Sequence, residues 1–146
     1  MSASAGRKAV PLYLLLFPVA IVSFVGALAS DIAYAASAFL MWLNDAEWLI
    51  AIGLAFGAVA AIVLLVAFVR RPSIRRGPFG WLHLAVFVVA LLVELFNAFV
   101  HTSDGWTAVV PGGITLSAIG ALCGLIAVAL LFRMPAARVL NPEPIP

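Results

Sequence analysis

The chain has 146 residues, of which 66% are hydrophobic and 10% are charged, with a formal net charge of +2 and a mean hydropathy of +1.22. A soluble globular domain is typically about 45–50% apolar and about 25% charged. This composition excludes a water-soluble enzyme, a disordered tail and a nucleic-acid-binding domain. The single cysteine, Cys123, excludes an internal disulfide framework.

Four apolar stretches divide the chain, and each approaches the roughly 20 residues that an α-helix needs to cross about 30 Å of hydrocarbon. Because a backbone in lipid must satisfy its own hydrogen bonds, runs of this length predict helices. We therefore expect an all-α integral membrane bundle, a single domain over 1–146, with transmembrane helices at about 11–36, 47–69, 79–101 and 113–133. The apolar segment 31–42 is expected to prolong the first helix or to lie along the outer surface, and the tail 135–146 to be extended.

All eight basic residues fall on one side of this four-span arrangement. They are Arg7, Lys8, Arg70, Arg71, Arg75, Arg76, Arg133 and Arg138. The opposite connections carry Asp45, Glu47 and Asp104 and no Lys or Arg. The positive-inside rule therefore predicts that both termini are cytoplasmic, and we expect a multi-pass protein of the bacterial cytoplasmic (inner) membrane. The basic cluster at 70–76 either contacts anionic lipid headgroups or only fixes the orientation.

The third predicted span carries nearly all of the polar side chains at membrane depth: His83, Glu94, Asn97 and His101. At about 100° per residue, these four positions lie on one face of a helix. An ionisable group at the centre of the bilayer costs at least about 2.5 kcal/mol, so this face is expected to point at protein or water rather than at lipid.

Partners for these groups within the chain are few. At the depth of Glu94 the nearest candidates are Ser23 and Cys123, and no basic residue lies there. Near the outer end of the first helix, Asp31 and Tyr34 are one turn apart and are expected to bond each other or to cap the helix end.

Four interpretations of the polar face follow from its residue types. It is a proton relay with Glu94 as the central carrier, a haem b site with a histidine as axial ligand, a quinone site, or a structural device. In the structural interpretation, Glu94 and Asn97 join two helices while both histidines sit in water at the membrane interfaces. Because His83 and His101 lie eighteen residues apart, about 27 Å along one helix, they cannot bind the same iron.

Two glycine pairs, Gly53/Gly57 and Gly120/Gly124, lie one turn apart and favour close packing of a neighbouring helix. The serines and threonines form no catalytic set with histidine and carboxylate, and two distant histidines cannot share a metal. We therefore expect no catalytic residue and no enzyme. The pattern favours a non-catalytic subunit or accessory protein of a larger membrane complex, without a cofactor, in contact with the lipid bilayer and with other subunits or further copies of itself. The alternative is a haem b- or quinone-binding electron-transfer protein that uses the polar face of the third helix.

Several motifs carry a family resemblance. They are Phe17-Pro18, Asp31 with Tyr34, the run 46–61 in the second helix, Gly80-Trp-Leu-His83 followed by Asn97, and the run 113–120 that opens the fourth helix. Over most of its length the chain resembles the bacterial family called domain of unknown function 2231, small membrane proteins with four predicted helices. The resemblance implies the four-helix fold and implies that His83 and Asn97 are site residues. Its loose grouping with cytochrome b-like bundles implies haem as the cofactor of the alternative function.

The chain also departs from the family pattern. Leu16 stands where members often carry a histidine before the Phe-Pro pair, and His101 stands where arginine is common. Leu64 and Ala67 replace a glycine and an aspartate late in the second helix, and the closing glycine pair of the fourth helix is absent. The loss of the first-helix histidine weakens the implication of haem.

Overall fold

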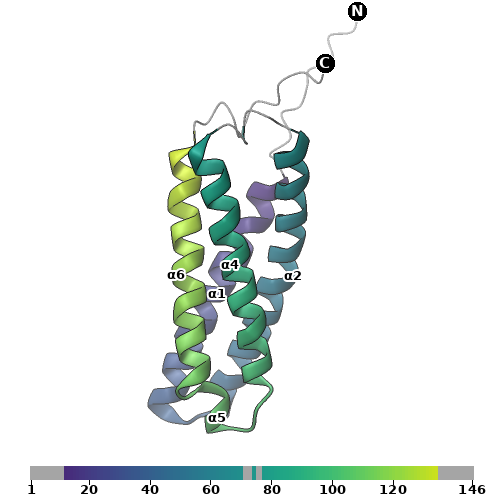
Figure 1. Cartoon of the computed structure of the whole chain (residues 1–146). Helices are drawn as coiled ribbons and strands as arrows, with labels where there is room; N and C mark the ends of the chain where they lie inside the picture. The colour runs from purple at the N-terminus through teal and green to yellow at the C-terminus, as the bar shows by residue number, and fades with distance from the viewer. Residues whose placement is uncertain (1–11, 71–73, 75–76, 135–146) are drawn as a thin grey trace, which may run out of the picture.

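The computed structural model describes residues 12–70, 74 and 77–134. Within these residues the chain is helical and has no strand. The helices are α1 (Leu12–Ser37), α2 (Leu40–Arg70), α4 (Pro78–His101), α5 (Trp106–Val109) and α6 (Gly112–Arg133) (Figure 1). The four long helices confirm the predicted all-α bundle, and the expected extended tail at 135–146 lies outside the described residues.

The four spans are long and apolar enough to cross a membrane. They cover Leu12–Ser37, Leu40–Val69, Pro78–His101 and Trp106–Arg133, with mean hydropathies between 2.2 and 2.9. Pro78 opens α4 at its first turn, where the missing backbone N–H of proline is not needed by the helix. The predicted number and order of the transmembrane helices are therefore confirmed.

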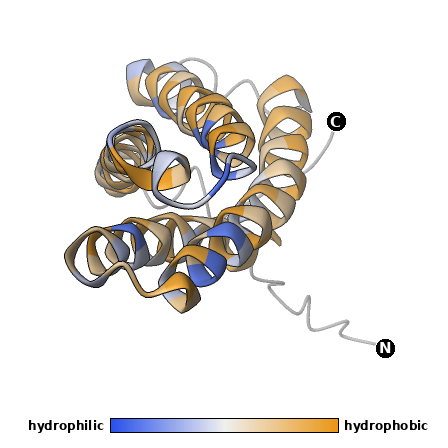
Figure 2. Ribbon diagram, turned by 90° about the horizontal axis from the view of Figure 1, so that it is seen from below, coloured by the Kyte–Doolittle hydropathy of each residue, from blue (hydrophilic) through white to orange (hydrophobic). Residues whose placement is uncertain are grey.

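The long helices form a ring in the order α1, α2, α4, α6, with α6 closing against α1. Figure 2, seen from the end that carries α5, shows the four helices around a common centre. Because neighbours in the ring run antiparallel, α1 and α4 lie across the bundle from each other and run parallel. The first described residues of α1 and the last of α6 lie at the same end of the bundle (Figure 1).

The turn between α1 and α2 differs from the predicted boundaries. The segment 31–42 prolongs the first helix only as far as Ser37, close to its predicted end at about residue 36, because the chain reverses at Ala38, which has a positive φ of 54°. The first helix ends at Ser37, and the second begins at Leu40 rather than near residue 47. A backbone hydrogen bond of 2.7 Å, donated by the Ala38 N–H to the Tyr34 carbonyl oxygen, closes the last turn of α1. The short helix α5 was not expected.

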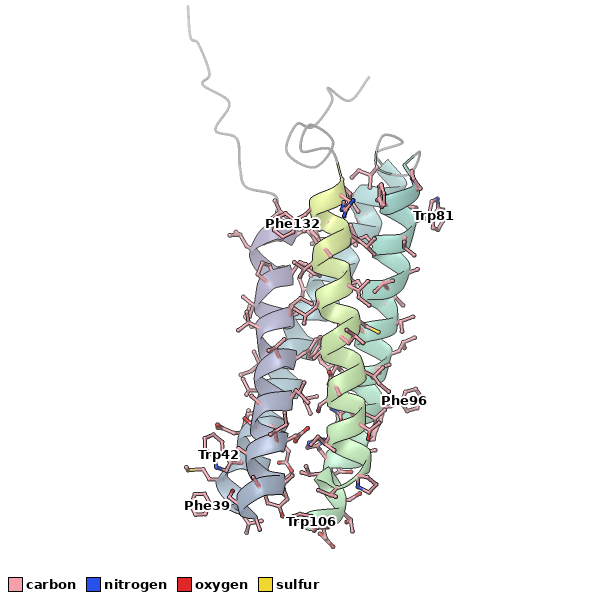
Figure 3. The ribbon with its side chains drawn as sticks, turned by 90° about the vertical axis from the view of Figure 1, so that its left-hand side faces the viewer. Phe39, Trp42, Trp81, Phe96, Trp106 and Phe132 are labelled. Atoms are coloured by element: carbon pink, nitrogen blue, oxygen red, sulfur yellow. The ribbon has the colours of Figure 1, made fainter. Side chains whose placement is uncertain are left out.

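Exposed aromatic side chains mark both ends of the bundle. Figure 3 places Trp81 and Phe132 near one end and Phe39, Trp42 and Trp106 near the other, all directed away from the core. Tryptophan is enriched where a membrane protein meets the headgroup region. These two belts agree with four helices that cross one bilayer.

Which end faces the cytoplasm stays a prediction. Arg70 is the last residue of α2 and Arg133 the last of α6, and both lie at the end where α1 begins. Arg71, Arg75 and Arg76, the other candidate lipid-headgroup residues, lie outside the described residues.

The two glycine pairs face the inside of the bundle. A Cβ atom added to Gly53 would run into the ring of Phe24, and one at Gly57 would meet Leu91. On α6, Gly124 packs against Ile21, and Gly120 packs against the carboxylate of Glu94. These glycines therefore make room for side chains from neighbouring helices of this chain.

Candidate functional site

The polar face predicted for the third helix points into the bundle. His83, Glu94 and Asn97 are fully buried, and His101 is 2% exposed. The prediction that the four side chains share one inward face of α4 is confirmed. The expectation that both histidines sit in water at the membrane interfaces is wrong.

The side chain of His101 reaches across the bundle and contacts α1. Its Nε2 lies 2.9 Å from Oδ1 of Asp31, and its Nδ1 lies 3.0 Å from the backbone oxygen of Asn97. The other carboxylate oxygen, Oδ2 of Asp31, accepts a hydrogen bond of 2.5 Å from the hydroxyl of Ser117 on α6. Three helices thus meet at the buried carboxylate of Asp31, which sequence analysis had assigned to Tyr34 or to a helix cap.

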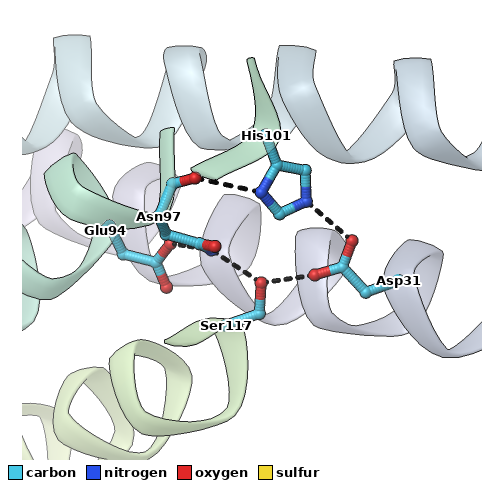
Figure 4. A network of polar contacts seen from close by, with 5 residues as sticks. All are labelled: Asp31, Glu94, Asn97, His101 and Ser117. Atoms are coloured by element: carbon cyan, nitrogen blue, oxygen red, sulfur yellow. Dashed lines mark hydrogen bonds and ion pairs between the residues drawn. The ribbon is translucent and has the colours of Figure 1, made fainter. Parts of the chain in front are cut away.

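Asn97 links Ser117 to Glu94. Its Nδ2 donates to Oγ of Ser117 at 2.7 Å and to Oε2 of Glu94 at 3.0 Å, so both amide hydrogens are used. Asp31, His101, Ser117, Asn97 and Glu94 form one continuous hydrogen-bonded set, which we call the outer network (Figure 4). Neither Ser23 nor Cys123, the partners expected for Glu94, belongs to it.

The register of α4 against α6 explains why the network fits. As α4 advances through Glu94, Asn97 and His101, its neighbours on α6 step back through 120, 117 and 113. A Cβ at Gly120 would collide with the Glu94 carboxylate, and one at Gly113 would lie 2.9 Å from Cε1 of His101. Two glycines therefore accommodate the two largest polar side chains, and the serine between them supplies the hydrogen bond.

A second buried polar cluster lies around His83, eleven residues, or about three helical turns, before Glu94 on α4. The Nε2 atom of His83 lies 2.5 Å from the hydroxyl of Tyr13 on α1, and its Nδ1 lies 2.8 Å from the backbone oxygen of Ala127 on α6. Phe17 and Phe87 enclose this cluster, with ring centroids 4.9 Å apart. Like the outer network, this cluster joins α4 to both α1 and α6.

The Tyr13–His83 and Asp31–His101 contacts follow from the same register between α1 and α4. Tyr13 and His83 are 70 residues apart, and so are Asp31 and His101. Within each helix the two positions are eighteen residues apart, which is five turns at 3.6 residues per turn. Because α1 and α4 run parallel, an equal spacing on both helices brings both pairs together at once.

Hydrogen-bond chemistry fixes where the ring protons lie. A backbone carbonyl only accepts, so Nδ1 carries the hydrogen in both histidines. The Nε2 atom of His83 then accepts from the hydroxyl of Tyr13, which leaves this ring neutral. Between His101 and Asp31 one proton is shared. With the proton on the ring they are an ion pair and with the proton on the carboxyl a neutral pair, so the two residues together carry no net charge in either form.

These residues do not fit a haem iron. An axial histidine ligates through a ring nitrogen lone pair, and here each histidine already uses both ring nitrogens in hydrogen bonds within the bundle. The chain between 12 and 134, apart from 71–73 and 75–76, also has no group of three His, Cys, Asp or Glu residues placed to hold a metal ion. Ser117 and His101 both bind Asp31 rather than each other, so the set lacks the serine–histidine contact of a hydrolase triad.

Comparison with known proteins gives one finding. A family model described as "Predicted membrane protein (DUF2231)" matches residues 9–134. No curated protein and no solved structure matches the chain. The matched range covers the four spans and both polar clusters, which agrees with a multi-pass bacterial membrane protein.

Proposed function

The chain belongs to the DUF2231 family of membrane proteins, and we propose that it is a non-catalytic subunit or accessory protein of a larger membrane complex. The proposal rests on the hydrogen bonds that the buried reactive side chains make within the chain. Both ring nitrogens of both histidines, both oxygens of Asp31 and the hydroxyls of Tyr13 and Ser117 are hydrogen-bonded within the chain. Groups held in this way fix the helices relative to one another and are not free to attack or ligate a substrate.

The connections between the described helices support the same proposal. Two residues, Ala38 and Phe39, join α1 to α2, and the link from α4 to α6 is ten residues that include α5. Loops of this length are too short to build a catalytic domain outside the membrane. What the protein offers to its surroundings is the apolar outer face of the bundle, including Phe96, which is 65% exposed, and Leu122, which is 59% exposed.

Photo-crosslinking in native membranes tests whether this face meets protein. A photoreactive amino acid at Phe96 or Leu122 is expected to form adducts with another protein subunit or with a second copy of the chain, identified by mass spectrometry. The matched control is the same amino acid at Phe87, which is fully buried in the same helix as Phe96 and should form adducts only within the chain. Adducts to lipid alone from both exposed positions would contradict the proposal.

An optical spectrum of the purified protein tests the alternative function. We expect no haem absorption, since neither histidine has a free ring nitrogen. A reducible Soret band at about one haem per chain would overturn the proposal in favour of an electron-transfer protein. A quinone that co-purifies and is lost in a Glu94→Gln variant would do the same.

A further inference from the structure

The two halves of the bundle repeat one sequence pattern. Residues of α1 recur 70 positions later on α4, and residues of α2 recur 67 positions later on α6. The identical pairs on α1 and α4 are Leu12 and Leu82, Leu14 and Leu84, Phe17 and Phe87, Val19 and Val89, and Ala20 and Ala90. The identical pairs on α2 and α6 are Ala51 and Ala118, Ile52 and Ile119, Gly53 and Gly120, Gly57 and Gly124, and Ala60 and Ala127. Self-similarity at a fixed spacing indicates an internal repeat.

Burial repeats with the same spacing. We call α1 with α2 the first hairpin and α4 with α6 the second hairpin. Between 12 and 20, buried, half-buried and exposed positions follow one another in the same order as between 82 and 90. On α2 the buried positions 46, 50, 53, 57 and 60 have buried counterparts at 113, 117, 120, 124 and 127 on α6. Equivalent faces of the two hairpins therefore point into the bundle.

Residues at equivalent positions contact each other across the bundle. In two copies of one unit related by a twofold axis, only positions beside the axis meet their own equivalents, and the interface is self-complementary. Three pairs of side chains do so here, each joining a residue of α1 to the residue 70 positions later on α4. They are Tyr13 with His83, Phe17 with Phe87, and Asp31 with His101. An approximate twofold axis therefore runs between α1 and α4, along the length of the bundle.

Contacts away from this axis come in two copies. Between the hairpins, a glycine of α2 lies against α4 in the way that its counterpart on α6 lies against α1. Within each hairpin, a second glycine accommodates the large side chain at one position of the first helix. These contacts are Gly57 with Leu91 and Gly124 with Ile21 between the hairpins, and Gly53 with Phe24 and Gly120 with Glu94 within them.

The two hairpins differ where the outer network lies. The polar side chains of the second hairpin have apolar counterparts in the first, and all of these counterparts are buried. The pairs are Glu94 and Phe24, Asn97 and Ala27, and Ser117 and Ile50. The same backbone arrangement thus holds a hydrogen-bonded set in one hairpin and apolar packing in the other.

We infer that the chain is an internal duplication of one helical hairpin, and that the inner face of each hairpin is a self-complementary interaction surface whose partner is the other copy. Parallel repeats in membrane proteins are related by an axis along the membrane normal. Here α1 runs parallel to α4 and α2 runs parallel to α6, as such an axis requires. This inference goes beyond the proposed function and does not depend on it.

A reciprocal exchange at the Tyr13–His83 contact tests whether the two positions are equivalent. In Tyr13→His/His83→Tyr, the axis places the backbone oxygen of Ala60 beside the new imidazole, as that of Ala127 lies beside His83. Each single substitution leaves two histidines, too short to meet, or two tyrosines, too long to fit. In equilibrium unfolding in mixed micelles, each single substitution should raise the unfolding constant at least about threefold. The double variant should be more stable than either single variant.

The matched control exchanges two contacting residues that the axis does not relate. Asn97 and Ser117 are hydrogen-bonded at 2.7 Å, but their surroundings are not equivalent, so Asn97→Ser/Ser117→Asn should be no more stable than its single variants. A Tyr13→His/His83→Tyr variant that is no more stable than both of its single variants would overturn the inference. Recovery in both double variants would overturn it too, because conserved side-chain volume would then explain the result.

Spin-label distances in lipid bilayers test the same axis without a buried substitution. In a Cys123→Ala background, labels at Val22 and Ile126 should be as far apart as labels at Leu92 and Val59, because the axis exchanges the two pairs. All four side chains are exposed. Unequal distances would overturn the inference. Equal distances would sustain it even if the exchange variants fail to fold.

Discussion

Replacing Ser117 with alanine should destabilise the bundle far more than its size suggests. The Ser117 hydroxyl accepts from Asn97 at 2.7 Å and donates to Asp31 at 2.5 Å, so it joins α6 to α4 and to α1 with one atom. Alanine removes that atom and leaves an amide hydrogen and a carboxylate oxygen without partners in a fully buried place.

The magnitude follows from these two bonds. Interhelical hydrogen bonds in membrane proteins contribute about 0.6 kcal/mol each on average, which gives a lower value of about 1 kcal/mol for the pair. The largest measured contribution is about 1.7 kcal/mol for one such bond, so the expected loss in free energy of unfolding for the two bonds is about 1–3.5 kcal/mol. At a factor of ten per 1.4 kcal/mol, the unfolding constant should rise roughly fivefold to several hundredfold.

Equilibrium unfolding in mixed micelles, followed by the fluorescence of the four tryptophans, measures this loss. The matched control is Thr115→Ala on the same helix. Thr115 is exposed, and its hydroxyl bonds only to the backbone oxygen of Pro111 at 2.7 Å, so the change should be within about 0.5 kcal/mol. Equal stabilities for Ser117→Ala and Thr115→Ala would refute the reasoning, because the buried network would then contribute nothing.

Three further predictions concern the buried cluster around His83, the glycines and the orientation of the chain in the membrane. Tyr13→Phe removes the donor to the first histidine of α4 and should cost about 1–3 kcal/mol in the same unfolding assay; no loss would show that this ring does not depend on the hydroxyl. Gly120→Ala places a methyl group against the buried glutamate and should cost about 1–3 kcal/mol in free energy of unfolding. The control is Gly112→Ala, which should be tolerated because its Cβ would have its nearest neighbour at 3.5 Å. Equal effects of the two substitutions would contradict the register of α4 against α6. In a cysteine-free background, Asp104→Cys should react with an impermeant maleimide added to intact cells and Arg75→Cys should not, and the reverse pattern would contradict cytoplasmic termini.

The sequence predicts the spans and the inward face of α4 because both depend on one helix at a time. Length and hydropathy define each span, and helical periodicity places His83, Glu94, Asn97 and His101 on one side. Tyr13 and Ser117 were missed, and Asp31 was given the wrong partner, because pairing depends on the register between helices. Periodicity within one helix carries no information about that register.

One sequence signal could have revealed the pairs. Tyr13 and Asp31 are separated by eighteen residues in the first span, and His83 and His101 by eighteen residues in the third. Since the first and third spans of a bundle run parallel, equal spacings predict two contacts at two depths. The histidines were expected in water because they lie near the ends of an apolar run, but side chains at the same depth on α1 bury them.

The central claim is that the buried polar side chains are hydrogen-bonded to one another between helices. Its most direct test is the distance between the His101 ring and the Asp31 carboxylate in a lipid bilayer. Solid-state NMR of protein labelled with ¹⁵N-histidine and ¹³C-aspartate in bilayers measures it, and only two histidines need assignment, which a His83→Gln variant provides. We expect strong dipolar coupling between Nε2 of His101 and an aspartate carboxyl carbon, as the 2.9 Å contact requires. An Nε2 atom with no aspartate carbon in hydrogen-bonding range would contradict the account, because the buried histidine would then be free to bind something else.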